Sequence, residues 1–327
     1  MSRLSLSIAV GDYDRTRALI DGSVRIDGVN AVVMTLPPEE IFFRSFRHAE
    51  FDICELSLSS YALKLAQRDC PYVAVPVFLS RAFRHNSIYV RTDRIKAPGD
   101  LKGRRVGVPE YQLTANVWAR AILQDDHGVA PADVIWVRGG IMQPGRPEKI
   151  AVQPPPGLRI ENAPEGETIS ALLDRGEIDG FIAPRPPACV GNPKVAWLFA
   201  DPVAAATDYY KRTAIFPIMH PVGVRRTLAD AHPWLPAAVL KAFTQAKARA
   251  LTELTDTSSP KVTLPFIEEQ LKAACALMGT DFWPYGVNVN RATLTTFLRH
   301  HQRQGLSARL LSVDEMFHPA SYETAAI

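Results

Sequence analysis

The sequence predicts an α/β fold of two lobes followed by a helical C-terminal part. Strand-like and helix-like segments alternate from the N-terminus to residue 183, the pattern of α/β layers around a largely parallel sheet. At ~150 residues per domain, a chain of 327 residues has room for two such units. After residue 213 the apolar pattern becomes mostly helical.

The first group of elements begins with a clear strand. Residues 4–10 alternate apolar and polar side chains with the two-residue period of a strand, which ends at Gly11. Ile41 and Phe42 fall on one face of a predicted helix, and Ser57 is a suitable cap for the next one. The elements predicted after the first strand are a helix over 39–47, strands over 51–55, 72–78 and 87–90, and a helix over 57–68.

The second group follows a turn-rich join at residues 97–103. It contains predicted strands over 105–108, 133–137 and 178–183 and helices over 113–127 and 168–175. Residues 139–167 are rich in Pro and Gly, so we expect a loop with a short hairpin, long enough to be functional. A strand over 215–219 leads to three helices, over 233–254, 264–278 and 291–304. We expect His300 and His301 to lie on a solvated face of the last helix.

The composition excludes several classes of function. Hydrophobic residues make up 47% and charged residues 22%, the mix of a globular protein with sizeable cores. The net charge of +3 gives no electrostatic basis for binding nucleic acid. No apolar run reaches the ~20 residues that span a bilayer. We therefore expect neither a nucleic-acid nor a membrane partner.

The cysteines and the N-terminal residues favour a cytoplasmic protein. Cys54, Cys70, Cys189 and Cys275 are isolated and form no C-x-x-C pair, which argues against a zinc or disulfide framework and fits a reducing compartment. The strand-like N-terminus contains no long apolar stretch of an export signal.

Several sequence blocks are similar to those of known proteins. DLKGRRVGV (residues 100–108), followed by a predicted helix, is similar to the start of the second lobe in type 2 periplasmic-binding-protein folds. More specific blocks are GDYDRT (11–16), PEEIFFR (38–44), EFDICELSLSSY (50–61), SRAFRH (80–85), VGVPEYQ (106–112), IFPIMH (215–220), DFWPYG (281–286) and QGLSAR (304–309). Together these blocks resemble the 4,5-dihydroxyphthalate decarboxylase family.

This resemblance implies a two-lobed type 2 periplasmic-binding-protein-like fold and an enzyme of phthalate degradation. Lobe I would comprise residues 1–92 and 217–327, and lobe II residues 93–216, with the ligand cleft between them. The implied enzyme is cytoplasmic and homo-oligomeric, and it converts 4,5-dihydroxyphthalate to protocatechuate and carbon dioxide. Its substrate would be a small aromatic dicarboxylate, and no cofactor is expected.

The chemistry of this reaction sets requirements for the site. Direct loss of carbon dioxide would leave an aryl anion, which is very unfavourable, so the easier route first protonates the ring carbon that bears the carboxylate. The site then needs a proton donor near the ring, a base near the catechol, cationic or N–H donors for the carboxylate that stays, and a less polar environment for the one that leaves.

The first candidates lie between two predicted strands. Arg81 and Arg84 could hold carboxylates bidentately, and His85 could transfer a proton near neutral pH. The alternative is a solvated basic turn. Asp14 and Arg15 follow the first strand, where ligands sit in open α/β sheets. Arg15 could bind a carboxylate and Asp14 could act as a base, although a capped helix start explains both equally well.

The remaining candidates follow other predicted strands. Ser59 and Ser60 open a helix after Glu55, where hydroxyl and N–H groups could bind an anion. Glu110 is a candidate acid or base beside Tyr111 and Thr114, or simply a favourable charge at a helix N-terminus. His220, just past the strand over 215–219, could contact substrate or transfer a proton. With His85 and a carboxylate it could instead hold a divalent metal, but we assign no metal ligand.

We therefore expect Arg15, Arg81 and Arg84 to hold the carboxylates, and His85 or Glu110, with Asp14, to handle protons. Two alternatives stay open. One is a solute-binding protein for an aromatic acid, which an absent export signal disfavours. The other is an enzyme of the same fold acting on another aromatic acid.

Overall fold

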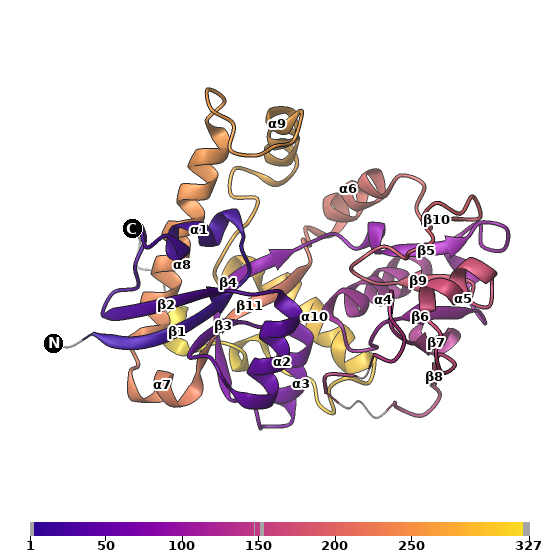
Figure 1. Cartoon of the computed structure of the whole chain (residues 1–327), viewed down its shortest axis with the longest axis horizontal. Helices are drawn as coiled ribbons and strands as arrows, with labels where there is room; N and C mark the ends of the chain where they lie inside the picture. Colours follow the sequence, from indigo (N-terminus) through magenta and orange to yellow (C-terminus); the bar gives the residue numbers. More distant parts are fainter. Residues whose placement is uncertain (1–2, 147, 151–153, 323–327) are drawn as a thin grey trace.

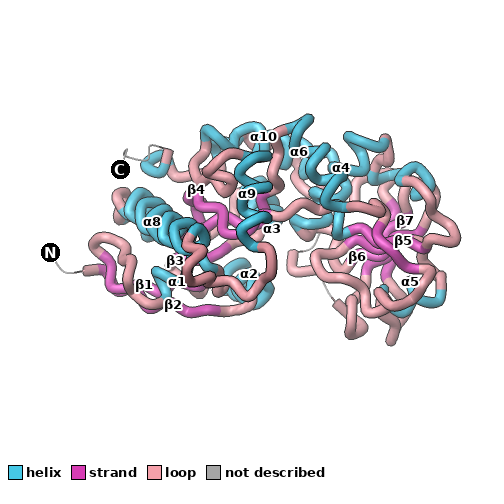
Figure 2. Tube along the Cα trace, turned by 90° about the horizontal axis from the view of Figure 1, so that it is seen from above, coloured by secondary structure: helices cyan, strands magenta, loops and turns pink. Residues whose placement is uncertain are grey.

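The computed structural model describes residues 3–146, 148–150 and 154–322. Two β-sheets, each accompanied by helices, lie at opposite ends of the long axis of the molecule (Figure 1). The view from above shows the same two halves, with α4 between the second sheet and the rest of the chain (Figure 2). The predicted two-lobed α/β class is therefore confirmed.

The first sheet has the strand order β2-β1-β3-β11-β4. Strand β1 (Leu4–Val10) pairs in parallel with β2 (Val29–Thr35) and β3 (Ile53–Glu55). Strand β11 (Ile218–Arg225) runs antiparallel to both β3 and β4 (Tyr72–Arg81). Because β11 runs in the opposite direction, its first residues lie at the edge where β1, β3 and β4 end.

Helices surround this sheet and connect it to the other half. They are α1 (Asp14–Ile20), α2 (Pro38–His48), α3 (Leu58–Ala66), α7 (Arg226–Ala231), α8 (Leu235–Thr255) and α10 (Arg291–Arg303). Helix α8 packs against α1 and β4, while α10 packs against α3 and against α4 of the second half. The half built on the first sheet and the half built on the second sheet are therefore joined by packing of α10 against α4, in addition to the chain segments that connect them.

The second sheet has the order β10-β5-β9-β6-β7-β8. Its strands are β5 (Ile88–Arg91), β6 (Arg105–Val108), β7 (Ile135–Arg138), β8 (Arg159–Asn162), β9 (Gly180–Ile182) and β10 (Val195–Trp197). Its helices are α4 (Thr114–His127), α5 (Ile169–Arg175) and α6 (Pro202–Thr213). Strands β6 to β9 are parallel to one another, so the loops after β6, β7 and β9 meet at one edge.

The chain crosses between the sheets at residues 82–87 and returns at 214–217. The crossings lie side by side, because the Ala82 N–H donates to the Pro217 carbonyl at 3.2 Å. Strand β5 belongs to the second sheet, so the first crossing precedes residue 92, where we expected the lobe boundary. The division of the chain into domains otherwise stays a prediction.

Most segments with strong apolar periodicity form the predicted helices and strands. Three differences between the predicted and observed elements have physical causes. Strand β2 was not predicted because it is an edge strand with mostly exposed side chains. The expected hairpin is wrong: β8 pairs in parallel with β7. His220 lies inside β11 rather than past a strand, because Pro221 is accommodated at a β-bulge.

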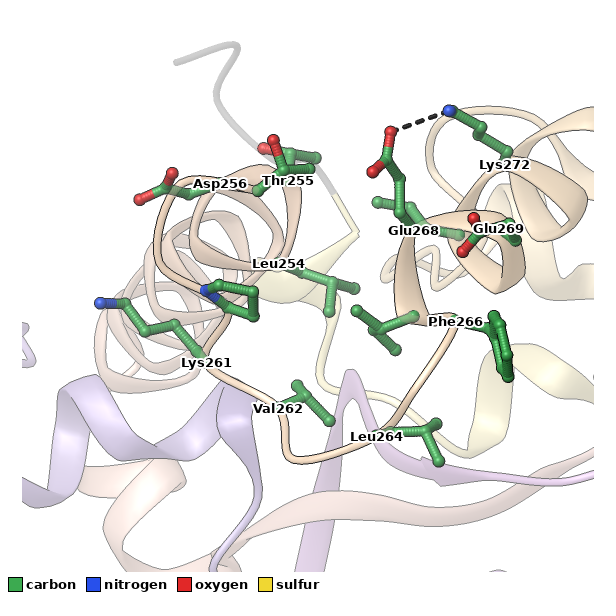
Figure 3. Close-up of a pocket in the computed structure, with 14 residues that line it drawn as sticks. Leu254, Thr255, Asp256, Lys261, Val262, Leu264, Phe266, Glu268, Glu269 and Lys272 are labelled. Carbon is green, nitrogen blue, oxygen red and sulfur yellow. Dashed lines mark hydrogen bonds and ion pairs between the residues drawn. The ribbon is translucent and has the colours of Figure 1, made fainter.

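A helical arm projects from the first half (Figure 1). It consists of the end of α8, residues 256–266 and α9 (Ile267–Met278), of which no residue is buried. The arm encloses a groove of about 400 Å³ lined by Leu254, Val262, Leu264 and Phe266, among others (Figure 3). No arginine or histidine lines this groove, so it lacks the groups expected of the site.

Within the described part of the chain, no helix is both long and apolar enough to cross a membrane.

Candidate active site

The strand ends of the first sheet bring together a glutamate, a histidine and a tyrosine. Glu55 is the last residue of β3, Tyr13 follows β1, and His220 lies near the start of β11. The pairing of Val222 with Glu55 places His220 just beyond the end of β3. Antiparallel β11 thereby brings His220 to Glu55 across a sequence separation of 165 residues.

Glu55 is fully buried, and three donors satisfy its carboxylate. His220 Nδ1 lies 2.6 Å from Oε1, and the Tyr13 hydroxyl donates to the same oxygen at 2.8 Å. The Gly11 N–H donates to Oε2 at 3.0 Å. A buried carboxylate is tolerated only with such partners, so Glu55 is a fixed negative charge behind His220.

These contacts determine the protonation of the cluster. Burial alone would raise the pKa of Glu55, but the hydrogen bond and charge of His220, with Gly11 and Tyr13, lower it below the ordinary value. Burial and the Glu55 charge raise the pKa of Tyr13 far above its usual range, so Tyr13 remains a donor. Because the Glu55 carboxylate only accepts, Nδ1 of His220 carries a proton and Nε2 is left for chemistry.

His220 has one ring nitrogen without a protein partner in the described chain. Its side chain is 18% exposed, and its Nε2 has no hydrogen-bond partner among the described residues. The ring packs edge-on against Phe42 of α2, with 4.8 Å between ring centroids. A histidine oriented by a buried carboxylate and open at its other nitrogen is suited to general acid–base catalysis.

A cavity lies beside α2, the helix that also contacts His220, although His220 itself does not line it. It has a volume of about 680 Å³ and lies between α2 and the loops after β6, β7 and β9, and its lining includes Glu39, Pro109, Leu113, Met142, Arg146 and Arg185. Glu39 and Phe42 are three residues apart and therefore share a face of α2. The same face of α2 thus carries the contact to His220 and the wall of the cavity.

Arg15 and its neighbour Asp14 are engaged with each other and with the protein. Arg15 donates from Nε and Nη2 to the Leu79 carbonyl, and its Nη1 lies 3.0 Å from Asp14. The guanidinium stacks between the rings of Tyr13 and Trp283, at 4.3 and 4.4 Å from their centroids. This geometry favours a role in fixing Tyr13 over direct binding of a carboxylate.

Arg81 and Arg84 differ in their surroundings. Arg81 is buried and donates to the Phe216 and Pro284 carbonyls and to Asn290, so its Nη atoms are occupied. Arg84 contacts the Met219 sulfur at 3.3 Å and the Ser87 hydroxyl at 3.5 Å, and no carboxylate of the described residues forms an ion pair with it. Burial lowers the pKa of Arg84 to about 10. A half-buried cation with no anionic partner among the described residues favours Arg84 as a carboxylate ligand.

His85 is placed away from the Glu55 cluster. It is 2% exposed and packs against the rings of Phe199 and Tyr209, and its Nδ1 has no hydrogen-bond partner in the described chain. Burial lowers its pKa to about 4. The structure therefore favours His220 over His85 for proton transfer, while the role of His85 stays a prediction.

The pKa of His85 predicts a pH-dependent stability. Because the folded pKa lies below the unfolded value of 6.5, the unfolded state binds the proton more readily. A contribution on the order of 3 kcal/mol is thus present above pH 6.5 and is lost as the pH falls towards 4. Urea unfolding at pH 5 and 7 should show a smaller pH effect in His85→Phe than in the wild type. Equal pH effects, or loss of turnover in this variant, would contradict the packing role.

Glu110 is buried but already paired. It is 1% exposed and accepts from Arg146 Nε at 2.9 Å and from Lys149 N and Nζ at 3.1 Å each. Tyr111 is also buried, and its ring stacks under Arg120. Neither residue is free to approach a ligand in this arrangement.

Ser59, Ser60 and Thr114 lie in the contact between the two halves. Thr114 begins α4 and accepts from the Ser59 N–H at 3.0 Å. The Ser59 hydroxyl lies 3.0 Å from His301 Nε2, and the Ser60 hydroxyl donates to Gln112. All are buried, so their hydroxyls tie α3 to α4 and α10 rather than face an open anion site. His300 and His301 are fully buried as well, so their predicted solvation is wrong.

The described residues contain no group of three or more His, Cys, Asp or Glu side chains placed to hold a metal ion. His85 and His220, the two histidines of the metal alternative, have separate sets of contacts.

The sequence places Tyr13 and Glu55 among the candidate residues that follow strands, but it assigns neither of them a role. One signal was present: Glu55 is a carboxylate at the end of a buried strand segment, Phe51–Glu55, where a charge needs a partner. The partner itself, His220, could not be identified without the strand order.

The fold and the sequence both have known relatives. No protein-family model matches the chain. The fold is similar to the periplasmic aliphatic sulphonate binding protein SsuA of Escherichia coli (16% identity, 97% of this chain and 92% of that chain, TM-score 0.53). It is also similar to the putative sulfonate-binding protein SsuA of Methylobacillus flagellatus (15% identity, 98% and 93%, TM-score 0.55). These likenesses confirm the periplasmic-binding-protein-like fold.

The curated relatives are much closer in sequence. A 4,5-dihydroxyphthalate decarboxylase of Comamonas testosteroni is 59% identical over 330 aligned positions, covering 100% of both chains. One of Pseudomonas putida is 59% identical over 214 positions, covering 64% of this chain and 83% of that protein. The chain therefore belongs to the 4,5-dihydroxyphthalate decarboxylase family.

Proposed function

We propose that this protein is an aromatic-acid decarboxylase, a carbon–carbon lyase that converts 4,5-dihydroxyphthalate to protocatechuate and carbon dioxide in phthalate degradation. The observation that carries the proposal is the pairing of buried Glu55 with partly exposed His220, in a chain 59% identical to relatives with this name. A solute-binding protein of the same fold has no need of a proton-transfer pair. As an enzyme of aromatic catabolism, it would act in the cytoplasm.

The reaction needs one proton and releases one carbon dioxide. The imidazolium of His220 donates its Nε2 proton to the ring carbon that bears the departing carboxylate, and the hydroxyl para to that carbon supplies electron density. The C–C bond to the carboxylate then breaks, its electron pair restores the aromatic ring, and carbon dioxide leaves. His220 is reprotonated from water, so the enzyme returns to its starting state.

The residues around His220 have distinct roles in this proposal. The Glu55 carboxylate stabilises the imidazolium and fixes the ring through Nδ1. Tyr13 and Gly11 hold Glu55 in place. Arg84 is the favoured ligand of the carboxylate that stays. Arg15 holds the ring of Tyr13 in place, and Arg81 holds the returning crossing segment through the Phe216 carbonyl. The negative charge of Glu55 thus lies beside the imidazolium of His220 before that imidazolium gives up its proton.

A product assay tests this function. Purified protein is incubated with 4,5-dihydroxyphthalate, and protocatechuate is followed by chromatography together with released carbon dioxide. We expect equal amounts of the two products. Tight binding of the substrate without either product would favour the solute-binding alternative, and turnover only with another aromatic acid would favour a different substrate.

We also propose that the enzyme is a homo-oligomer assembled through the α8–α9 arm. Leu264 and Phe266 are 53% and 74% exposed, and Phe266 has a φ of 62°, a conformation that costs about 1–3 kcal/mol in a bulky residue. The arm presents both acidic and basic side chains, including Lys261 and Glu269, beside its apolar groove (Figure 3). A second copy of this surface offers complementary charges and apolar contacts.

Light scattering during size-exclusion chromatography checks this arrangement. We expect the wild type to exceed the 36.1 kDa of one chain, and the double variant Leu264→Ser, Phe266→Ser to shift towards it. Val32→Ser, at an apolar residue on β2 that is 66% exposed, serves as the control and should leave the mass unchanged. A wild type that elutes as a monomer would refute the proposal.

A further inference from the structure

One arginine lies between carboxylates from the two halves of the molecule. Arg146, in the loop after β7, places Nη2 2.8 Å from Glu110 Oε1 and 3.4 Å from Glu39 Oε1. Glu110 follows β6 of the second sheet, whereas Glu39 lies in the first turn of α2 beside the first sheet. The guanidinium therefore bridges the cavity wall from one half to the other.

The two carboxylates differ in how firmly they are held. Glu110 is buried and also bound by Lys149 through both its N–H and its ammonium group, so it anchors the loop to its own half. Glu39 is 41% exposed, and Arg146 is its ion-pair partner among the described residues. Arg146 itself is 25% exposed. The contact to Glu110 is thus the more buried and more extensively bonded of the two, and the contact to Glu39 is the more exposed.

The bridge is linked to the proton-transfer pair through α2. Glu39 precedes Phe42 by three residues, and Phe42 packs against His220. Arg146 and Glu39 both line the cavity of about 680 Å³. A shift of α2 relative to the loop would therefore change the cavity and the surroundings of His220 together.

We infer that Arg146 is a positioning residue that fastens the second half to α2 over a bound substrate, with Glu39 as the opening side of the latch and Glu110 as its anchor. This inference rests on the proposed function, because it assigns the cavity beside α2 to the substrate. The latch favours the closed, substrate-bound state and takes no part in the bond changes. Its loss should weaken substrate binding and leave the chemical step intact.

The test compares two neighbouring glutamates on α2. Glu39→Gln removes the contact across the cavity and leaves Arg146 paired with Glu110. Glu40→Gln removes the same charge one residue later, where Glu40 pairs with Arg44 of its own helix at 3.7 Å. For a partly exposed ion pair we expect KM for 4,5-dihydroxyphthalate to rise about two- to fivefold in Glu39→Gln, with kcat within twofold of the wild type. Glu40→Gln should change neither value.

Hydrogen exchange provides a readout that needs no activity. Backbone amides of residues 139–146 should exchange faster in Glu39→Gln than in the wild type or Glu40→Gln. If the two variants are indistinguishable in exchange, the latch is refuted. If exchange rises while KM stays unchanged in an active enzyme, the positioning role is refuted. Since exchange does not depend on turnover, a failure of the decarboxylase proposal is distinguished from a failure of the latch.

Discussion

Replacing His220 with asparagine is expected to lower kcat about 10²–10⁴-fold, the usual contribution of a positioned acid or base. The asparagine amide can still donate to Glu55 from the place of Nδ1, so the buried carboxylate keeps its partner. The variant lacks Nε2 and therefore cannot deliver a proton to the ring. Steady-state kinetics with 4,5-dihydroxyphthalate, with substrate binding measured by calorimetry, should show a loss of turnover with binding within a few-fold of the wild type.

His85→Phe is the matched histidine control, because it removes an imidazole that packs between aromatic rings. We expect this variant to retain most of its turnover. Normal turnover by His220→Asn would refute the assignment of proton transfer to His220. If, in addition, His85→Phe loses turnover, proton transfer is assigned to His85 instead.

Replacing Glu55 with glutamine is expected to reduce kcat by about 10²–10⁴-fold as well, as is found when the carboxylate behind a catalytic histidine becomes an amide. The amide has one accepting oxygen, whereas Glu55 accepts from His220, Tyr13 and Gly11. If the NH₂ group of the glutamine faces Gly11, it meets the Gly11 N–H, which is also a donor. If it faces His220, Nδ1 must accept, and the proton of the neutral imidazole moves to Nε2. The imidazolium also loses the negative charge that stabilises it.

The same variant has an expected effect on stability. The folded pKa of Glu55 is lowered, so its contribution is present above the ordinary value of 4.5 and is lost as the pH falls through the folded pKa. Urea unfolding at acidic pH should therefore show a smaller pH effect in Glu55→Gln than in the wild type. Glu50→Gln, at an exposed ion pair with Arg44, is the control and should alter turnover and stability little. Near-normal turnover in Glu55→Gln would remove the carboxylate from the mechanism.

Local patterns in the sequence were sufficient for many elements of the fold. Strands β1 (Leu4–Val10) and β6 (Arg105–Val108) have the predicted bounds, because two-residue periodicity and flanking turns are local signals. Edge strand β2 could not be predicted, because its side chains are mostly exposed and show no alternation of apolar and polar residues with burial. The end of a strand predicts where a site lies, which is why Asp14 and Arg15 were considered.

The composition of the site depended on tertiary structure. Glu55 and His220 meet only because antiparallel β11 lies between β3 and β4, an order that no local pattern contains. Arg15 and Ser59 have the right chemistry for anions, yet the folded chain satisfies them with the Leu79 carbonyl and with Thr114 and His301. Residue type and strand position therefore reduced the number of candidate site residues. The hydrogen bonds of the folded chain then distinguished side chains already bonded to protein groups from side chains that remain able to bind a ligand.

Turnover in D₂O tests whether the ring carbon is protonated as carbon dioxide leaves. The protein and 4,5-dihydroxyphthalate are incubated in D₂O, and the protocatechuate is examined by proton NMR and mass spectrometry. Ring protonation from a site that exchanges with solvent predicts one deuterium, at the carbon vacated by carbon dioxide, which lies ortho to the retained carboxylate. Recovery of unreacted substrate would refute the decarboxylase activity, and product that carries protium at that carbon would refute protonation from a solvent-exchanging site.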